Sequence, residues 1–517
     1  MENAQEEKKQ TGLLRALDSI ERVGNAMPHP ATLFIILSGV VMVASALCAS
    51  AGVAVTYSYY DSAAKAMGER TVAAVNLLSA DGLRWMITHV VSNFTGFFAL
   101  GTVFTCILGV SVAEGTGFMS AVLRKLASVT PGALLAPVCV FLGVMSNMAS
   151  STGYVVFVPL GAILFMSFKR HPIAGLAATF AGVSGGWSAN LLLGSNDPIM
   201  AGISTQAANI LDTGYNVLPT ANWFFMIAST ILITIIGTLV TEKIVEPRLG
   251  AYEFADDASV SDVSDAEKRG MRWAFTALVI YIAVILIALL PQNSLLRNPE
   301  TGAILSSPFM SGIIFFMMMF FLVPGLAYGV GAGTLKNDKD MIELMVKGIS
   351  GLSGFFVLIF FAAQFVAQFN YSNLGTIVSV KGADLLAGVG FVGLPLLICF
   401  VIVTAVLNIF IPVDTSKYAL MAPIFIPMFM RLGFSPEVTQ AAFRIGDSST
   451  NIISPLMPFF PLIVAFCQKY DKKSGIGTLI STMLPYSITF LLGWIALLAV
   501  WYLLGLPVGP GAGLVYP

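Results

Sequence analysis

Charge is scarce in this chain of 517 residues, because Asp, Glu, Lys and Arg make up only 11% of it. A soluble protein would carry roughly twice that charged fraction. Apolar residues reach 56%, the mean hydropathy is +0.84, and many stretches of about 20 residues are nearly free of charge. This composition predicts a polytopic helical membrane protein. The net charge of −1 and the lack of a basic tract give no reason to expect nucleic acid as a partner.

Histidine and cysteine are also scarce, and neither is placed as catalysis or metal binding would require. The three histidines, His29, His89 and His171, fall at the ends of predicted apolar segments, where interfacial residues are common. The five cysteines lie in or beside apolar segments without metal-ligand spacing and are interpreted as core residues. We therefore expect no enzyme and no cofactor, which leaves a carrier or a channel as the class of protein.

Lysine and arginine are distributed unevenly over the predicted loops, and their distribution predicts the topology. Two short apolar arms lie within 132–168, and the loops on both sides of this pair are basic, as cytoplasmic loops are. Since both flanks are then on the same side of the membrane, the pair is predicted to form a re-entrant hairpin. A matching hairpin is predicted near 385–430. With nine transmembrane helices beside the hairpins, 19 Lys and Arg residues fall in cytoplasmic segments and 6 outside.

The chain repeats itself at about half of its length. The motif Thr-Gly-Phe-Phe-Ala-Leu at 95–100 returns as Ser-Gly-Phe-Phe-Val-Leu at 353–358, which is 258 positions later, and Asn147 returns as Asn408, 261 positions later. Similar halves that each carry a polar break are typical of secondary transporters with inverted repeats. The predicted fold is an all-α polytopic membrane protein with nine transmembrane helices plus two re-entrant hairpins in two inverted-topology repeats.

These repeats also predict the domain organisation. The parts are an amphipathic N-terminal segment at 1–30, a first half with the first repeat at 31–241, a cytoplasmic linker at 242–272, a helix pair at 273–330 and the second repeat at 352–505. The N-terminal segment lacks the apolar core of a signal peptide and is expected on the cytoplasmic surface. The linker is rich in Asp, Ser and Ala, which predicts a mobile loop.

Small and hydroxyl-bearing residues surround an asparagine at the tip of each hairpin. Unwound backbone near Asn147 and Asn408 would free carbonyl oxygens, which suit Na⁺ together with the amide oxygens. Asn190 and Asn451 hold matching positions in the broken helices that follow, so all four are candidate Na⁺ ligands. Alternatively, these side chains only satisfy the helix kinks by local hydrogen bonds.

Two charged residues, Arg444 and Asp447, lie within one apolar stretch, where each costs about 2.5 to 3.5 kcal/mol on insertion scales. Their spacing of three places them on one helical face, where they can pair. Charges at such depth are candidates for a translocation path, and a purely structural ion pair is the alternative. Asp197, which precedes Pro198, is a further candidate or marks only the end of its helix.

Five further motifs are distinctive. They are the run at 174–190, Ile-Val-Glu-Pro-Arg-Leu-Gly at 244–250, Ala-Pro-Ile-Phe-Ile-Pro-Met at 422–428, Phe-Arg-Ile-Gly-Asp-Ser at 443–448 and Gly-Leu-Pro-Val-Gly-Pro-Gly at 505–511. From Pro28 to the C-terminus the chain resembles the p-aminobenzoyl-glutamate transporter (AbgT) family. The resemblance implies a homodimeric bacterial inner-membrane carrier for p-aminobenzoyl-glutamate, with nine spanning helices and two hairpins. In some members it implies export of sulfonamide antimetabolites.

The resemblance also implies roles for particular residues. It places Asp197, Asn408, Pro436, Arg444 and Asp447 in the translocation path, with Asn147 and Asn408 near the cation. Our full set of candidate substrate-binding residues is Ser150, Ser151, Asp197, Asp414, Thr415, Lys417, Tyr418, Pro436, Arg444 and Asp447.

Three places depart from the family pattern. Ser151 stands where a carboxylate is usual, Pro-Val-Asp-Thr at 412–415 where Gly-Ser-Ala-Ser is usual, and Lys417 and Tyr418 where Gln and Trp are usual. We hypothesise that Asp414 and Lys417 rebuild the charge pattern for a related anionic substrate, such as an amino-acid or peptide derivative. Alternatively, Lys417 snorkels to the membrane interface and Tyr418 anchors there.

The coupling ion stays open between Na⁺ and H⁺. One Na⁺ or one proton moving down a potential of 100 mV yields roughly 2.3 kcal/mol in either case, so the energetics do not choose. The oxygen-rich hairpin tips favour Na⁺ for uptake, whereas Asp197, Asp414 and Asp447 could carry protons for efflux. Saturable accumulation coupled to a gradient would separate a carrier from a channel or an enzyme.

Overall fold

The computed structural model describes residues 28, 30–61, 66–128, 131–149, 153–252, 264–291, 293–304 and 307–516. The amphipathic segment predicted at 1–30 lies almost entirely outside these residues. Ser150 and Ser151, which are predicted at the tip of the first hairpin, lie outside them as well.

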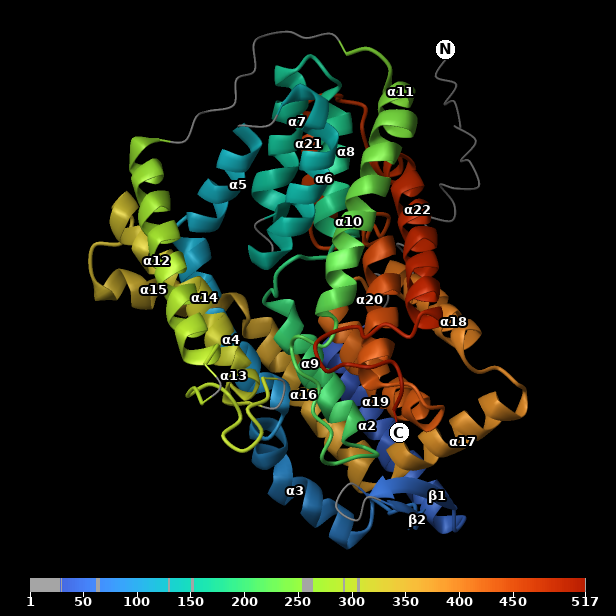
Figure 1. Ribbon diagram of the computed structural model, residues 1–517. Helices are drawn as coiled ribbons and strands as arrows, with labels where there is room; N and C mark the ends of the chain where they lie inside the picture. Colours follow the sequence, from blue (N-terminus) through green and yellow to red (C-terminus); the bar gives the residue numbers. More distant parts are fainter. Residues whose placement is uncertain are drawn as a thin grey trace, which may run out of the picture.

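Helices make up most of the described chain (Figure 1). The first half contains α2 (Pro30–Ser50), α3 (Ala80–Thr95), α4 (Phe98–Gly115), α5 (Phe118–Ser128), α6 (Leu135–Met145), α7 (Val158–Ser167), α8 (Pro172–Phe180), α9 (Asn196–Ala208), α10 (Trp223–Val240) and α11 (Glu246–Leu249). The second half contains α12 (Asp265–Leu289), α13 (Pro308–Ser311), α14 (Ile313–Ala332), α15 (Asp338–Gly351), α16 (Ser353–Tyr371), α17 (Leu374–Gly388), α18 (Leu394–Phe410), α19 (Asp414–Arg431), α20 (Pro436–Asn451), α21 (Phe460–Gln468) and α22 (Ile476–Leu503).

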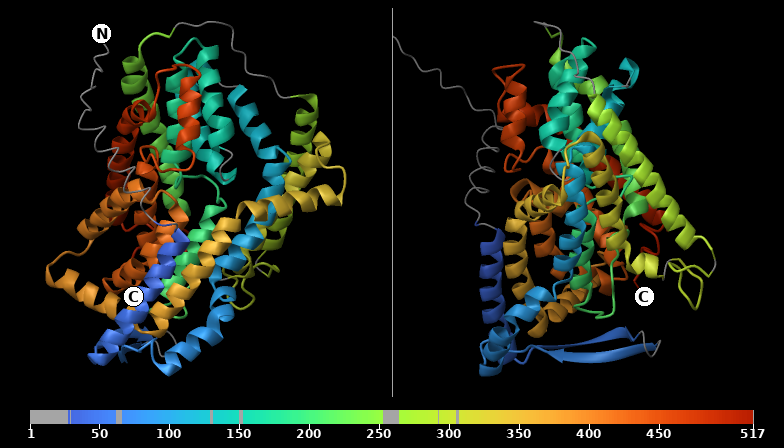
Figure 2. Two further views of the ribbon diagram at one scale, coloured as in Figure 1. Left: turned by 180° about the vertical axis from the view of Figure 1, so that it is seen from behind. Right: turned by 90° about the vertical axis from the view of Figure 1, so that its left-hand side faces the viewer.

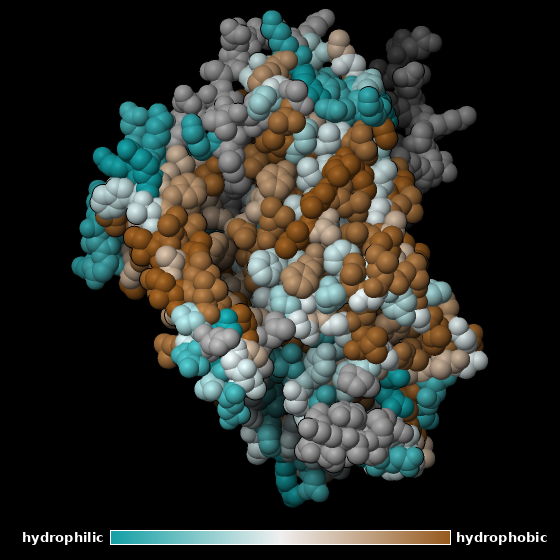
Figure 3. Space-filling view, viewed as in Figure 1, coloured by the Kyte–Doolittle hydropathy of each residue, from teal (hydrophilic) through white to brown (hydrophobic). Residues whose placement is uncertain are grey.

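Several helices carry apolar side chains on their outer faces. Within the described residues, six helices are long and apolar enough to cross a membrane: Ala31–Ser50, Trp223–Leu249, Asp265–Leu289, Ile313–Ala332, Ser353–Tyr371 and Ile476–Leu503. Figure 3 shows apolar surface over α12 and α14 and over α10 and α22, where Ile287 is 73% exposed and Leu492 60%. Large apolar surfaces of this kind are stable against lipid but not against water. The count of nine spanning helices remains a prediction.

The two halves match element by element. A shift of 258 residues places α3 and α4 over α15 and α16, and a shift of 261 places α6, α7 and α10 over α18, α19 and α22. The motif at 95–100 lies at the junction of α3 with α4, and its copy at 353–358 begins α16 directly after α15. The internal repeat read from the sequence is therefore a repeat of structure.

Equivalent helices of the two halves run in opposite directions. The helix Trp223–Leu249 contacts α22, and Arg248 near its end donates to the carbonyl of Ser481 near the start of α22, at 3.1 Å. At the other end, the rings of Phe225 and Trp501 lie 5.5 Å apart. This antiparallel contact between equivalent helices is what inverted-topology repeats produce.

Both predicted hairpins contain two helical arms joined at a polar break. In the first, α6 leads into a 3-10 turn at Ser146–Ala149, and a π-helical turn at Gly153–Phe157 leads into α7. In the second, α18 and α19 are joined at 411–413, and the ring of Phe400 on α18 lies 4.9 Å from that of Phe425 on α19. The second hairpin begins at Leu394 and not near 385, because Gly390 and Gly393 adopt positive φ and end the preceding helix.

A two-stranded ribbon outside the helices was not predicted. β1 (Ala54–Asp61) pairs antiparallel with β2 (Ala66–Ala73), and Thr56 faces Thr71 across the pair with their hydroxyls 2.8 Å apart. Val55 and Tyr57 are buried, whereas Ala54 and Thr56 are exposed, which is the alternation of a half-buried strand. Figure 2 shows the ribbon projecting to one side at the end of the molecule. The all-α class therefore describes the helical body alone.

The linker predicted at 242–272 is partly helical. Helical structure continues to Leu249, and α12 begins at Asp265 after a capping box between Ser264 and Glu267. Residues 253–263 lie outside the described chain. The described parts at both ends of the predicted loop are thus helical.

Candidate functional site

Helix α20 forms the polar centre of the protein, and every one of its residues is buried. The helix begins where the hydroxyl of Ser435 accepts from the backbone N–H of Val438 and where Pro436 fixes the first turn. It packs closely on α18, since a Cβ at Gly446 would lie 2.6 Å from Cβ of Thr404. Pro436 is placed in this capping turn, which is where the helix enters the core.

Lys417 and Asp447 form one buried ion pair. Lys417 Nζ lies 2.6 Å from Asp447 Oδ1, and their side chains are 0% and 1% exposed. Lys417 Nζ also donates to Asn408 Oδ1, and it lies 5.4 Å from the ring centre of Phe443. The alternative that Lys417 snorkels to the interface, with Tyr418 as an anchor, is therefore wrong, because Tyr418 is also only 1% exposed.

Arg444 and Asp197 form the second buried ion pair, with Nη2 and Oδ1 2.6 Å apart. The other carboxylate oxygen of Asp197 accepts from the backbone N–H of Gly194 at 2.7 Å. The expectation that Arg444 pairs with Asp447 on its own helix is wrong, because each side chain finds a partner on another element. Asp197 is also more than a helix end, since it lies buried in the first turn of α9.

Asp414 connects the tip of the second hairpin to the first repeat. Its Oδ2 accepts from Trp187 Nε1 and from Asn196 Nδ2, each at 2.8 Å. Its Oδ1 accepts from the backbone N–H of Thr415 at 2.6 Å, within the first turn of α19. The carboxylate that this chain has at the second hairpin tip thus bridges the two halves.

The two hairpin asparagines make equivalent contacts. Asn147 Nδ2 donates to the carbonyl of Gly186, and Asn408 Nδ2 donates to the carbonyl of Asp447, in both cases 39 residues further on. Asn408 Nδ2 also faces Asn451 Oδ1 at 2.8 Å. Two of the four candidate Na⁺ ligands, Asn408 and Asn451, therefore lie in contact with each other. Asn190 instead uses its Oδ1 for a local contact with the N–H of Leu192.

A chain of neutral polar groups runs beside Arg444 and escaped the sequence analysis. The hydroxyls of Tyr418 and Ser204 are 2.6 Å apart, Ser204 donates to Gln440 Oε1, and Gln440 Nε2 donates to Asn222 Oδ1. A signal for it exists in the sequence. Glu437, Gln440, Arg444, Asp447 and Asn451 recur at the spacing of one helical face, so α20 carries a polar stripe.

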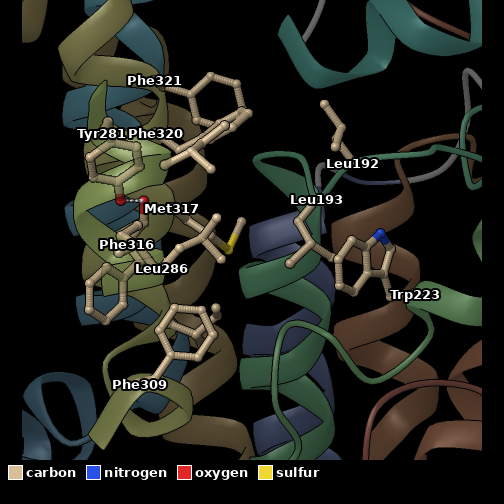
Figure 4. Close-up of a pocket in the computed structure, with 13 residues that line it drawn as sticks. Leu192, Leu193, Trp223, Tyr281, Leu286, Phe309, Phe316, Met317, Phe320 and Phe321 are labelled. Atoms are coloured by element: carbon tan, nitrogen blue, oxygen red, sulfur yellow. Dashed lines mark hydrogen bonds between the residues drawn. The ribbon is translucent and has the colours of Figure 1, made fainter. Parts of the chain in front are cut away.

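Two apolar cavities lie next to the site, of ≈ 210 and ≈ 300 Å³. They share Leu192, Phe320 and Phe321 in their walls. In Figure 4, aromatic side chains of α14 face Leu193 and Trp223 across the smaller cavity. The segment that lines this apolar cleft leads directly into α9, which carries Asp197. The sequence analysis did not predict the cleft.

A buried ion pair that joins two inverted repeats of apolar helices is typical of a membrane transporter. The chain belongs to the AbgT transporter family, whose model matches residues 15–516. It is 38% identical to the p-aminobenzoyl-glutamate transport protein of Escherichia coli K12, over 96% of each chain. The predicted family is therefore confirmed, and so is the prediction that the protein is a transporter and not an enzyme.

Two solved structures of transporters are similar to the whole fold. YdaH of Alcanivorax borkumensis is 43% identical, with a TM-score of 0.87 over 93% of this chain and 100% of that one. MtrF of Neisseria gonorrhoeae, from a class of antimetabolite efflux pumps, is 47% identical, with a TM-score of 0.91 over 96% and 100%. These similarities confirm the polytopic helical fold.

Proposed function

We propose that this protein is a secondary active transporter that moves p-aminobenzoyl-glutamate, or a related anionic aromatic or amino-acid conjugate, across the bacterial inner membrane. The observation that carries this proposal is the Arg444–Asp197 ion pair, which joins the second half to the first inside the protein. A substrate carboxylate that exchanges for Asp197 would separate these elements and bind Arg444 in a bidentate manner. The name of the Escherichia coli relative supports the substrate class.

The aromatic part of such a substrate would find rings beside Arg444. Tyr418 and Phe443 lie 4.4 Å apart between ring centres, next to both ion pairs. Tyr418 stands where the family usually has Trp, so the stacking surface is kept but is smaller. This substitution also favours the alternative that the substrate is a peptide or amino-acid derivative.

Efflux of sulfonamide antimetabolites is the second candidate function. Its support is the similarity to MtrF, which is higher than that to the Escherichia coli relative in sequence identity. In this case the driving ion is H⁺, and the proposed proton carriers are the buried carboxylates Asp197 and Asp447 and the half-buried carboxylate Asp414.

For uptake, Na⁺ is the proposed coupling ion. In the first half, Asn147 Oδ1 is buried and has no hydrogen-bond partner within the described part of the chain, so it is the oxygen best placed to face a cation. We also propose a homodimer, on the resemblance to the AbgT family alone, and cytoplasmic N-termini, on the positive-inside distribution of Lys and Arg.

The deciding experiment is uptake of labelled p-aminobenzoyl-glutamate into proteoliposomes at fixed pH. We expect accumulation with an inward Na⁺ gradient, its loss in Arg444→Gln, and its retention in the control Arg84→Gln, because Arg84 is exposed. In a parallel assay without a Na⁺ gradient, an outward proton gradient is applied across the vesicle membrane. Accumulation of a labelled sulfonamide that depends on this proton gradient would favour efflux. Absence of transport for both substrates under both gradients would refute the proposed substrate class.

A further inference from the structure

We infer that the ammonium group of Lys417 is a tethered cation that occupies the coupling-cation position of the second half. The position is defined by Asn408 Oδ1 and Asp447 Oδ1, and Lys417 Nζ contacts both oxygens from within the protein. This inference rests on the proposed function for its meaning in coupling. It goes beyond that function because it removes one exchangeable ion from the cycle.

The orientation of the Asn408 amide supports this reading. Its Nδ2 faces three acceptors on α20, the carbonyl of Asp447, Thr450 Oγ1 at 3.0 Å and Asn451 Oδ1 at 2.8 Å. Thr450 Oγ1 acts as an acceptor there because its own proton is donated to the carbonyl of Ala405. The amide oxygen of Asn408 must therefore point the other way, toward Lys417 Nζ.

Comparison of the halves shows that the lysine is an addition to a shared framework. Asn147 and Asn408 make the same contact 39 residues ahead, yet Asn147 Oδ1 has no partner within the described residues, whereas Asn408 Oδ1 holds Lys417. The sequence position 261 residues before Lys417 is Val156, which has no charge. Of the two hairpin asparagines, Asn408 alone thus has a cationic side chain at its amide oxygen within the described residues.

A fixed ammonium excludes a mobile cation from the same oxygens. Two positive charges that share Asp447 Oδ1 would lie within a few ångströms of each other, and buried surroundings screen their repulsion poorly. The ring of Phe443 closes a further side of Lys417. A lysine cannot leave with the substrate, so the second half contributes no released Na⁺ to each transport cycle.

The test measures the melting temperature of the purified protein in detergent, in NaCl and in KCl of equal concentration. Lys417→Gln frees Asn408 Oδ1 and Asp447 Oδ1, so we expect it to gain a Na⁺-specific rise of about 2 to 5 °C over any rise in the unchanged chain. The double variant Lys417→Gln with Asp447→Asn is the matched control, which lacks the carboxylate and should not gain it. A Lys417→Gln variant that responds to Na⁺ no more than the unchanged chain overturns the inference.

A second measurement does not depend on the stability of Lys417→Gln. Equilibrium binding of ²²Na⁺ is compared between the unchanged chain and Asp447→Asn. We expect equal Na⁺ affinity, because Asp447 holds lysine and not Na⁺. A loss of Na⁺ binding in Asp447→Asn protein that still elutes as a single folded species would show that its second oxygen, Oδ2, binds Na⁺ beside the lysine, and would overturn the inference. Neither measurement uses substrate, so their outcome is independent of the proposed transport activity.

Discussion

At the scale of single residues, the buried cations Lys417 and Arg444 are tolerated in this protein because each meets a carboxylate from another element. Arg444 reaches Asp197 across 247 positions of sequence, and Lys417 reaches Asp447 across 30. An ion pair inside low dielectric is weak evidence for stability, but removal of one partner is strongly unfavourable. The pairs therefore hold their elements together only while both partners remain in place.

Asp197→Asn is expected to lower the free energy of unfolding by about 3 to 5 kcal/mol, because it leaves Arg444 buried without a carboxylate. The measurement is thermal unfolding of the purified protein. Asp81→Asn is the control, since Asp81 pairs with Arg84 at the surface with 86% of its side chain exposed, and surface pairs contribute about 0 to 1 kcal/mol. Equal destabilisation by both substitutions would contradict the role given to the buried pair.

The sequence identified the charged members of the site but not their partners. The sequence marks three of these residues because each ionisable side chain lies in an apolar stretch, where burial of a charge is costly: Lys417, Arg444 and Asp447. The spacing of Arg444 and Asp447 suggested a local pair, whereas packing of α20 against α9 and α19 directs the two side chains to separate partners. Long-range contacts of this kind depend on tertiary packing, which helical spacing alone does not determine.

At the scale of elements, small residues set how closely the hairpins pack on the broken helices. A Cβ at Gly182 would meet the backbone carbonyl of Val140, and one at Gly446 would meet that of Val401. Val140 and Val401 are 261 positions apart and the two glycines are 264 apart, so each half packs a glycine against an equivalent carbonyl, from positions that differ by one helical turn. Close backbone approach through glycine is the usual means of packing helices in membranes.

Gly446→Ala is expected to push α20 away from α18 and so to move Asp447 relative to Asn408. Overpacking of this kind costs about 1 to 3 kcal/mol, and we expect a lower melting temperature together with a transport rate reduced about tenfold. Gly354→Ala on α16 is the control, because nothing lies within 4 Å of a Cβ there. Normal transport by Gly446→Ala would show that the contact is not critical.

Element types were predictable where apolar runs were long, and element ends were not. The hairpin expected to begin near 385 begins at Leu394, and the residues up to Gly388 belong to α17, because Gly390 and Gly393 turn the chain through positive φ. The β-ribbon was missed because its alternation of Val55 and Tyr57 with polar residues is short beside the apolar runs. Its pairing is therefore visible only in the structure.

At the scale of the whole molecule, the β-ribbon and the start of α22 lie toward opposite ends of the helical bundle (Figure 1). The predicted topology puts the ribbon on the periplasmic side of the membrane and the segment 467–474 in the cytoplasm. The apolar cleft lies between these ends, where α14 faces the segment that leads into α9. The predicted topology thus places the site and the cleft near the middle of the membrane.

Cysteine labelling tests this topology in a background whose five cysteines are replaced. Arg70→Cys lies in β2 and Lys473→Cys between α21 and α22, and both native side chains are exposed. We expect a membrane-impermeant maleimide to label Arg70→Cys in intact cells and Lys473→Cys only after permeabilisation. Labelling of both positions in intact cells would reject the predicted number of crossings between them.

The contact of α10 with α22 has an evolutionary consequence. Equivalent helices that touch in antiparallel orientation lie about a local two-fold axis, which is the geometry of an isologous interface. A half-length ancestor would have used this surface twice, as a dimer of copies inserted in opposite orientations. After duplication and fusion of its gene, the two ends of the interface were free to diverge. Thr241 now hydrogen-bonds Tyr486 at one end, whereas at the other end Phe225 meets the ring of Trp501.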